Sequence, residues 1–425
     1  MRWVRGLGIT EKITAYALTI VSAAFYAASF LCELCWFFSF FSLSPLFLTR
    51  FSSWRVAFLN GFLWGVIAYT AVLSALLDVM WRLGNGLHVV WYLVAFVIYF
   101  AVFSGFWFFA AQILALIIRS WHLAWLITSF AYWAWMQIGF FYFITGRLQG
   151  YGLALPFVPV MEYSAFLLCL PVIRWWGMLI VVLMFHLAIA HKKWWLITLG
   201  LLFFGGSYWY ALWHKQEERE IKNIVKITGG FASYTPYERA HEICEKLLEG
   251  KQKNPQAVVF VLPESAFPYP LNEHTYALEM WSSNGNLHEK YLIIGTHYAC
   301  RECRQLHNSA CVIYQGRVIY RYDKCGMLPF FEEEIFDIWL SPFLRDKKEM
   351  RAGCKQESIF VIPEVGPIKF YICSELLWNL PTDKKVIGLV HDGHYRYAYF
   401  PRLFKCYGYM RALEGKSELI YCGWR

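Results

Sequence analysis

Charged residues are scarce in this 425-residue chain, where Asp, Glu, Lys and Arg together make up 16% of the sequence. Soluble globular proteins average about 25% charged residues, so a single water-soluble domain is excluded. The shortage lies in the first half of the chain. Residues 1–215 hold 4 acidic and 12 basic side chains, whereas residues 216–425 hold 26 acidic and 27 basic side chains. The basic excess therefore accompanies apolar segments instead of covering a polar domain, which argues against nucleic-acid binding.

The sequence also lacks a glycine-rich phosphate loop and an internal repeat, so neither a nucleotide-phosphate site nor a repeat architecture is expected. Cys300 and Cys303 form a CxxC, but no pair of cysteines or histidines at zinc spacing accompanies them, and we expect neither a metal nor a cofactor. Residues 216–425 contain nine cysteines. Because nine is odd, at least one thiol stays outside intramolecular disulfides in an oxidising compartment.

Long apolar runs fill the first half of the chain. A transmembrane helix needs roughly 20 apolar residues, because every backbone polar group must bond internally within the bilayer. Runs of about this length predict a helical membrane domain over residues 1–215 with seven spans, near residues 13–31, 34–49, 56–79, 88–118, 123–145, 174–190 and 194–213. The segment 150–173 contains three prolines and is a candidate for a re-entrant loop, so six or eight spans stay open as alternatives.

The positions of Lys and Arg beside these spans predict the orientation, because cytoplasmic loops carry the excess of positive charge. With the N-terminus inside, eight of the twelve flanking basic residues are cytoplasmic. An odd number of spans then places residues 216–425 on the far side. We therefore predict a multi-pass protein of a bacterial inner membrane, with its second half in the periplasm and with no cleavable signal peptide.

Residues 216–425 show the pattern of an α/β layered domain. Short runs rich in Val, Ile, Phe and Tyr predict buried strands at residues 257–262, 291–298, 310–322, 358–362, 368–373, 386–390 and 418–422. Gln315 and Gly316 separate two alternating runs and predict a β-hairpin. Helices are expected over residues 236–250, with Thr235 as N-cap and Gly250 as the stop, and over residues 402–415.

Three polar residues follow predicted strands, where the reactive groups of α/β sheets usually lie. Glu264 follows the strand at 257–262, Lys324 follows the hairpin, and Cys373 ends the run at 368–373. Each has an ordinary structural explanation when taken singly. Together they form a chemical set, because a thiol nucleophile needs a base to take its proton and a cation to hold the oxyanion.

The segments around these residues resemble the nitrilase superfamily. They are VLPESAFP at 261–268, YDKCGMLPFFEE at 322–333 and YICSE at 371–375, and further matches are His307-Asn308-Ser309, Asp392 and residues 411–414. Seven apolar spans before such a domain resemble the apolipoprotein N-acyltransferases, the inner-membrane enzymes that add the third acyl chain to bacterial lipoproteins. The resemblance implies a nitrilase-like αββα sandwich over residues 216–425.

The resemblance also implies a role for each matching residue. Glu264 would be the general base, Lys324 would stabilise the oxyanion, and Cys373 would become an acyl thioester. Glu332 matches a second family glutamate that supports the lysine or the acyl-transfer step, and Glu375 matches the acidic residue two places after the nucleophile. The implied partners are a phospholipid acyl donor, a lipoprotein acceptor and the bilayer, and a monomer is expected.

This sequence departs from the family at three points. Ser374 replaces the usual aromatic residue after the nucleophile, and Cys325 replaces a basic residue after the lysine. The family also continues with more strands and a last transmembrane helix, whereas this sequence ends at Arg425. The alternatives are a membrane-anchored nitrilase-type amidase or hydrolase, a nitrilase-like protein of the conjugal-transfer type, and a non-catalytic component of an envelope assembly.

Overall fold

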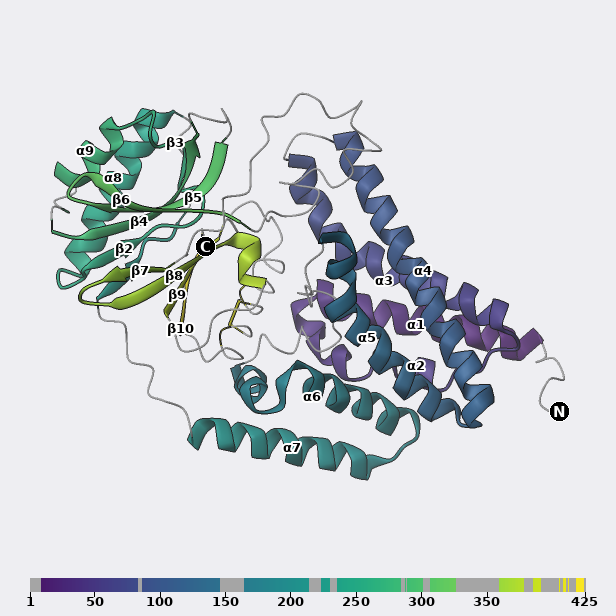
Figure 1. The fold of residues 1–425 in the computed structure, drawn as a ribbon. Coiled ribbons are helices and arrows are strands. Elements are labelled where there is room, and N and C mark those ends of the chain that lie inside the picture. The colour runs from purple at the N-terminus through teal and green to yellow at the C-terminus, as the bar shows by residue number, and fades with distance from the viewer. Residues whose placement is uncertain are drawn as a thin grey trace. The chain divides into compact units, whose positions relative to one another are not determined.

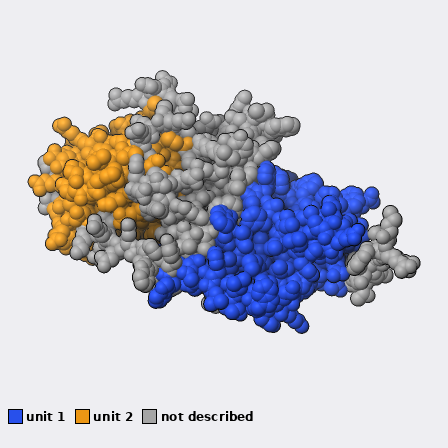
Figure 2. Space-filling view, turned by 60° about the horizontal axis from the view of Figure 1, so that its bottom comes forward, with its two compact units in different colours: residues 1–215, 395–406 blue, residues 216–394, 407–425 orange. Residues whose placement is uncertain are grey.

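The computed structural model describes residues 9–82, 86–145, 164–213, 223–229, 235–283, 287, 289–300, 306–325, 359–377, 385–390, 405, 408–409, 412 and 418–423. The chain divides into two compact units, one of residues 1–215 with 395–406 and one of residues 216–394 with 407–425 (Figure 2). The first unit is helical and the second holds all the described strands (Figure 1).

The first unit consists of long apolar helices. They are α1 (Ile9–Leu31), α3 (Trp54–Arg82), α4 (Gly86–Ile118), α5 (Trp121–Thr145), α6 (Ser164–Ala190) and α7 (Trp194–Trp213). Within the described residues, three stretches are long and apolar enough to cross a membrane: Ile13–Leu31, Trp54–Ser74 and Val94–Ile118. These coincide with three of the seven expected spans, and the other four and the orientation stay predictions.

The expected span at residues 34–49 is not one continuous helix. It forms a short 3₁₀ helix, η1 (Glu33–Phe40), and a single-turn helix, α2 (Ser44–Phe47). Pro45 lies in the first turn of α2, because a proline has no N–H to donate and disfavours helical backbone in the residue before it. Leu43, Leu46 and Phe47 are buried, so this segment packs inside the helical unit.

Helices α3 and α4 pack closely along a stripe of small residues. A Cβ atom on Gly61 would lie 2.3 Å from the carbonyl oxygen of Ser104, and one on Gly65 would lie 2.5 Å from the Cα of Ala101. Neither distance leaves room for a methyl group. The two glycines are four residues apart on α3, which is the spacing by which helices in lipid bring their backbones together.

Replacing Gly61 by alanine is expected to destabilise the helical unit by about 1–3 kcal/mol, because the added methyl forces the two backbones apart. Gly205 in α7 is the matched control, since an added Cβ there meets nothing within 4 Å. Gly205→Ala should leave stability unchanged or raise it by about 0.5–1 kcal/mol through the helix preference of alanine. Thermal unfolding of the full chain in detergent measures both, and equal behaviour of the two variants would contradict close α3–α4 packing.

One end of the helical unit collects positive charge. The rings of His122 and His191 lie with their centroids 3.6 Å apart. Burial lowers the pKa of His122, and the nearby His191, Arg50 and Lys193 lower it further. Arg50 and Lys193 are two of the eight basic residues expected on the cytoplasmic side, and both lie close enough to His122 to lower its pKa.

The second unit contains two sheets. The first has the order β1 (Ile224–Lys226), β2 (Val259–Val261), β4 (Tyr291–Ala299), β5 (Leu306–Tyr314) and β6 (Arg317–Asp323), with β3 (Phe267–Pro270) also paired to β4. The second has the order β10 (Glu418–Cys422), β9 (Lys385–Leu389), β8 (Gly366–Ile372) and β7 (Ile359–Ile362). Strands β1, β2 and β4 are parallel in the first sheet, as are β8, β9 and β10 in the second.

In this unit α8 (Pro236–Lys253) and α9 (Tyr276–Ser283) lie along the first sheet (Figure 1). Two apolar clusters fill the spaces between the layers. On one face of the first sheet, residues such as Phe260 and Ile294 pack against α8 and α9. On its other face, residues such as Val261 and Ile293 pack against Phe370 and other residues of the second sheet. The described residues therefore form a helix layer and two sheet layers, three of the four layers in the expected αββα sandwich.

The predicted hairpin and the predicted N-cap of this unit are confirmed. Strands β5 and β6 form the expected antiparallel hairpin, with positive φ at both Gln315 and Gly316, and Thr235 caps α8 by accepting from the N–H of Glu238 at 3.3 Å. The expected stop at Gly250 is wrong, because α8 continues to Lys253. A Cβ on Gly250 would lie 2.4 Å from Ile227 Cδ1, so this glycine permits close packing instead of ending the helix. Most of the helix expected over 402–415 lies outside the described residues.

Candidate active site

Glu264 lies in the break between β2 and β3 of the first sheet. Strands β2 and β3 both pair with β4, and residues 262–266 form the kink between them. Ser265, inside the kink, has a φ of 52°, a strained value for a residue with a side chain. Gly295 of β4 faces the kink so closely that a Cβ there would lie 2.4 Å from Glu264 Cα and 2.5 Å from Pro263 O. Only glycine fits at this position, and its small size lets the Glu264 turn lie against β4.

The structure brings Glu264 and Lys324 together as a buried ion pair. Lys324 Nζ lies 3.7 Å from Glu264 Oε1, and the two side chains are 0% and 5% exposed. Asn308 of β5 donates from Nδ2 to the same Glu264 oxygen at 2.7 Å. Removing two charges from water is unfavourable unless they are paired and hydrogen-bonded. Burying Glu264 and Lys324 therefore has a large desolvation cost, which fold stability alone does not require.

Cys373 is the first residue after β8 and begins the short 3₁₀ helix η5 (Cys373–Leu377). Its φ is 50°, in the left-handed region that residues with a Cβ rarely adopt. Strained positions of this kind concentrate at active sites. The side chain is of intermediate exposure and forms no disulfide with a described cysteine, so the thiol is neither sealed in the core nor cross-linked there.

Glu375 connects the Cys373 turn to the Lys324 loop. Its Oε2 accepts from the N–H of Ile372 at 2.8 Å, and its Oε1 accepts from the N–H of Cys325 and from the hydroxyl of Tyr322, both at 2.8 Å. The residues that precede Cys373 and follow Lys324 in the chain are thus held by one carboxylate. Because Glu375 is buried, these bonds are little weakened by solvent.

Two tyrosine hydroxyls near this carboxylate stay protonated. Burial raises the pKa of Tyr322 far above its usual range, and the charge of Glu375 raises it further; the pKa of Tyr371 is raised by the same two causes. The Tyr322 hydroxyl therefore remains a donor to Glu375. Elsewhere in the sheet, burial, followed by the charge of Asp323, raises the pKa of the Cys311 thiol on β5 to about 12.

The predicted site residues are thus partly assembled. Glu264 and Lys324 are in contact, and Glu375 links the turn of Cys373 to the loop of Lys324. Glu332 lies outside the described residues. The sequence pattern indicated no role for Asn308 or Tyr322. Asn308 belongs to the segment His307-Asn308-Ser309, and Tyr322 lies near the end of β6, two residues before the lysine.

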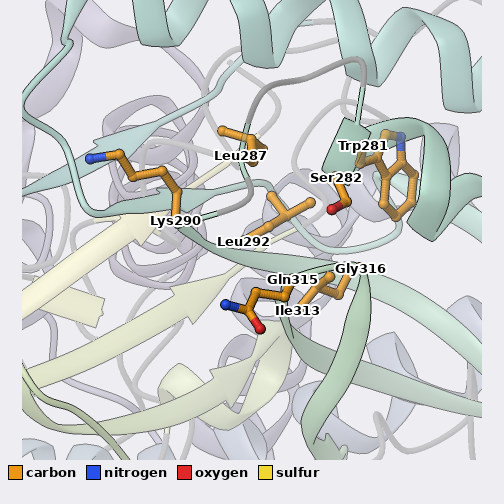
Figure 3. Close-up of a pocket in the computed structure, with 8 residues that line it drawn as sticks. All are labelled: Trp281, Ser282, Leu287, Lys290, Leu292, Ile313, Gln315 and Gly316. Atoms are coloured by element: carbon orange, nitrogen blue, oxygen red, sulfur yellow. The ribbon is translucent and has the colours of Figure 1, made fainter.

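A small hollow lies elsewhere in the unit, between α9 and the β5–β6 hairpin (Figure 3). It is lined by Trp281, Ser282, Leu287, Lys290, Leu292, Ile313, Gln315 and Gly316. Its cavity volume of about 10 Å³ holds about one water molecule. None of the candidate residues lines it, and several of its lining residues belong to the cluster packed against the helices. We therefore do not assign the reaction to this hollow.

The described residues contain no group of three or more His, Cys, Asp and Glu side chains that could hold a metal ion. The candidate site itself offers a thiol, a carboxylate, an ammonium and an amide. These groups are sufficient for covalent acyl chemistry, in which a positioned base and a cation support a nucleophile.

No family model matches the chain, and no curated protein matches it. Solved structures of carbon-nitrogen hydrolases are similar to it at low identity. A carbon-nitrogen hydrolase from Helicobacter pylori is 14% identical over 46% of this chain and 70% of its own length, with a TM-score of 0.36. A Saccharomyces cerevisiae member of branch 10 of the nitrilase superfamily is 11% identical over 47% of this chain and 74% of its own, with a TM-score of 0.33.

A glutamine-dependent NAD+ synthetase from Acinetobacter baumannii is 15% identical over 40% of this chain, with a TM-score of 0.30. The chain covers about a third, 32%, of the length of that protein.

Proposed function

We propose that the protein is a membrane acyltransferase that moves a fatty acyl group from a phospholipid, through a thioester on Cys373, to the N-terminal amine of a diacylglyceryl-cysteine lipoprotein. The observation that carries the proposal is the buried pair of Glu264 and Lys324, with the Cys373 turn fastened to the Lys324 loop through Glu375. The lipid substrates are proposed from the resemblance of the sequence to apolipoprotein N-acyltransferases and from the long apolar helices of the first unit.

In the first half-reaction, Glu264 accepts the thiol proton of Cys373 and the sulfur attacks the ester carbonyl carbon of the phospholipid. Lys324 stabilises the negative charge that develops on the carbonyl oxygen. When the tetrahedral intermediate collapses, the carbon–oxygen bond of the ester breaks. Glu264 returns its proton to the leaving oxygen, so a lysophospholipid departs and the acyl group stays on Cys373.

In the second half-reaction, the amine of the acceptor attacks the thioester carbonyl and Glu264 takes the amine proton. The carbon–sulfur bond breaks, the amide forms, and the proton passes from Glu264 to the Cys373 sulfur. Dividing the transfer into two steps lowers the barrier of each. Membrane helices serve this reaction physically, because the acyl chains remain in hydrocarbon while the carbonyl groups reach the thiol.

The test is peptide mass spectrometry of the full chain, purified in detergent with phospholipid. We expect a fatty-acyl adduct on Cys373 that disappears when a diacylglyceryl-cysteine peptide is added, with the appearance of the triacylated peptide. Cys373→Ala should give no adduct. Cys311→Ala is the matched control, since that thiol is fully buried and should leave the adduct unchanged.

The outcomes separate the alternatives. An adduct that water or a small amine removes, but the lipopeptide does not, would favour an anchored amidase or hydrolase. The absence of any adduct in the wild-type chain under these conditions, with small acyl esters as well as phospholipid, would contradict thioester chemistry and favour a non-catalytic role.

A further inference from the structure

We propose that Asn308 is a positioning residue that sets the place of Glu264 relative to Lys324. This inference rests on the function proposed above, because it assigns Asn308 its effect through the base of that reaction.

Asn308 bonds to both members of the buried pair. Its side-chain Nδ2 donates to Glu264 Oε1 at 2.7 Å, while its backbone carbonyl accepts from the N–H of Lys324 at 2.8 Å. The same Glu264 oxygen is the one that lies 3.7 Å from Lys324 Nζ. One residue of β5 therefore fixes the backbone from which the lysine extends and also the carboxylate oxygen that faces its ammonium.

The hydrogen bonding of Asn308 is incomplete in a way that favours a functional role. The side chain is 3% exposed, and its Oδ1 has no hydrogen-bond partner among the described residues. Burying an unsatisfied acceptor is unfavourable, and native proteins keep such groups mainly where the fold serves a task besides stability. An apolar residue would avoid this penalty, but it would remove the hydrogen bond that Asn308 donates to Glu264 Oε1.

The next residue on the same strand provides a structural comparison. Ser309 is also buried and donates from its hydroxyl to Asp323 Oδ1 at 2.6 Å. This hydrogen bond joins β5 to the last residue of β6, which directly precedes Lys324. Asp323 pairs on its other side with Arg321, 3.0 Å away, so the Ser309 bond belongs to a separate network. Ser309→Ala is therefore a matched control for the loss of a buried hydrogen bond at this place in the sheet.

The experiment measures how fast iodoacetamide alkylates Cys373 between about pH 5 and pH 9, using the full-length protein in detergent and peptide mass spectrometry. The reaction needs no acyl substrate, so it reports on the thiol and its base alone. The wild type is compared with Glu264→Gln, Asn308→Ala, Asn308→Asp and Ser309→Ala, and thermal unfolding of each variant verifies the fold.

In Asn308→Ala, the acid limb of the rate profile should move to higher pH, because a carboxylate that loses an N–H donor is less favoured in its charged form. The rate should fall about tenfold at the acid end, as a shift of one pH unit requires, and approach that of the wild type at the alkaline end. Asn308→Asp keeps the size of the side chain and should shift the limb further, since two adjacent carboxyl groups share a proton. Ser309→Ala should retain the wild-type profile.

Suppose that Asn308→Ala and Asn308→Asp fold and have the rate profile of the wild type, while Glu264→Gln changes the profile. The assignment of Glu264 as the base is then correct, and the role proposed for Asn308 is wrong. If the rate profile of Glu264→Gln also equals that of the wild type, Glu264 is not the base, and the inference on Asn308 is wrong as well. A shift in Ser309→Ala equal to that in Asn308→Ala would overturn the inference as well, because any buried bond at this site would then have the same effect. If Asn308→Ala does not fold, Asn308→Asp decides alone.

Discussion

Replacing Lys324 by methionine is expected to slow formation of the Cys373 acyl adduct by about 10²–10³-fold, the usual effect of removing one group that stabilises an oxyanion. The same change should destabilise the second unit by about 3–5 kcal/mol, because it leaves the carboxylate of Glu264 buried without its counter-charge. Both side chains are almost fully buried, so solvent cannot take over the role of the missing partner. Adduct formation by mass spectrometry and thermal unfolding measure the two effects separately.

A second substitution separates chemistry from folding. In the double variant Glu264→Gln with Lys324→Met, both charges are absent, and most of the lost stability should return, since no unpaired charge is then buried. Gln at position 264 retains an oxygen that can accept from Asn308. Adduct formation should stay at the background rate. A double variant as unstable as the single ones would contradict the direct coupling of these two groups.

The strands and the hairpin of the second unit could be predicted because their signals are local. Gln315 and Gly316 adopt the positive φ values that a two-residue hairpin demands, and apolar runs bounded by turn residues identify buried strands. Two short strands, β1 and β3, were missed because each has only three or four residues. Their pairing depends on β2 and β4, which supply the partner groups, and not on their own sequence.

The candidate site could be predicted as a set of residue types but not as a network. Glu264 and Lys324 were found because each follows a strand, and the structure places them in contact. The part of Asn308 depends on which strands lie next to each other, because β5 is the neighbour of both β4 and β6. Neighbourhood in a sheet is a tertiary property, so no spacing along the chain indicated it. Gly250 was misread for the same reason: its need for a small side chain comes from Ile227 on another element.

The helical unit shows the limits of composition in another way. Apolar length predicts which segments suit a bilayer, and α1, α3 and α4 have that length. The segment at 34–49 is also apolar, but it is divided between η1 and the single-turn helix α2 and packs its Leu46 and Phe47 inside the unit. Hydropathy indicates whether a segment prefers lipid or water. Packing decides whether a short apolar segment spans the bilayer or is buried between neighbouring helices.

Replacing Glu375 by glutamine is expected to affect folding and chemistry together. The carboxylate accepts three hydrogen bonds, two from backbone N–H groups and one from Tyr322. Glutamine has only one oxygen, so its NH₂ group must face a donor and at least one bond is lost. Hydrogen bonds to a charged group contribute about 1.5–3 kcal/mol each, and a buried donor left unsatisfied costs a similar amount, so a loss of about 3 kcal/mol or more is expected in thermal unfolding.

The reaction should slow by about 10²-fold in this variant, the effect of displacing a reacting group by about 1 Å. Cys373 is held at a φ of 50°, a strained conformation that persists only where the surrounding contacts enforce it, and Glu375 supplies contacts on both sides of the site. Glu364→Gln is the matched control, because Glu364 is an exposed carboxylate in the turn between β7 and β8. It should behave as the wild type in both measurements. A Glu375→Gln protein that unfolds early but forms the adduct at the wild-type rate would show that the strained turn keeps its geometry without this carboxylate, and that Glu375 serves the fold alone.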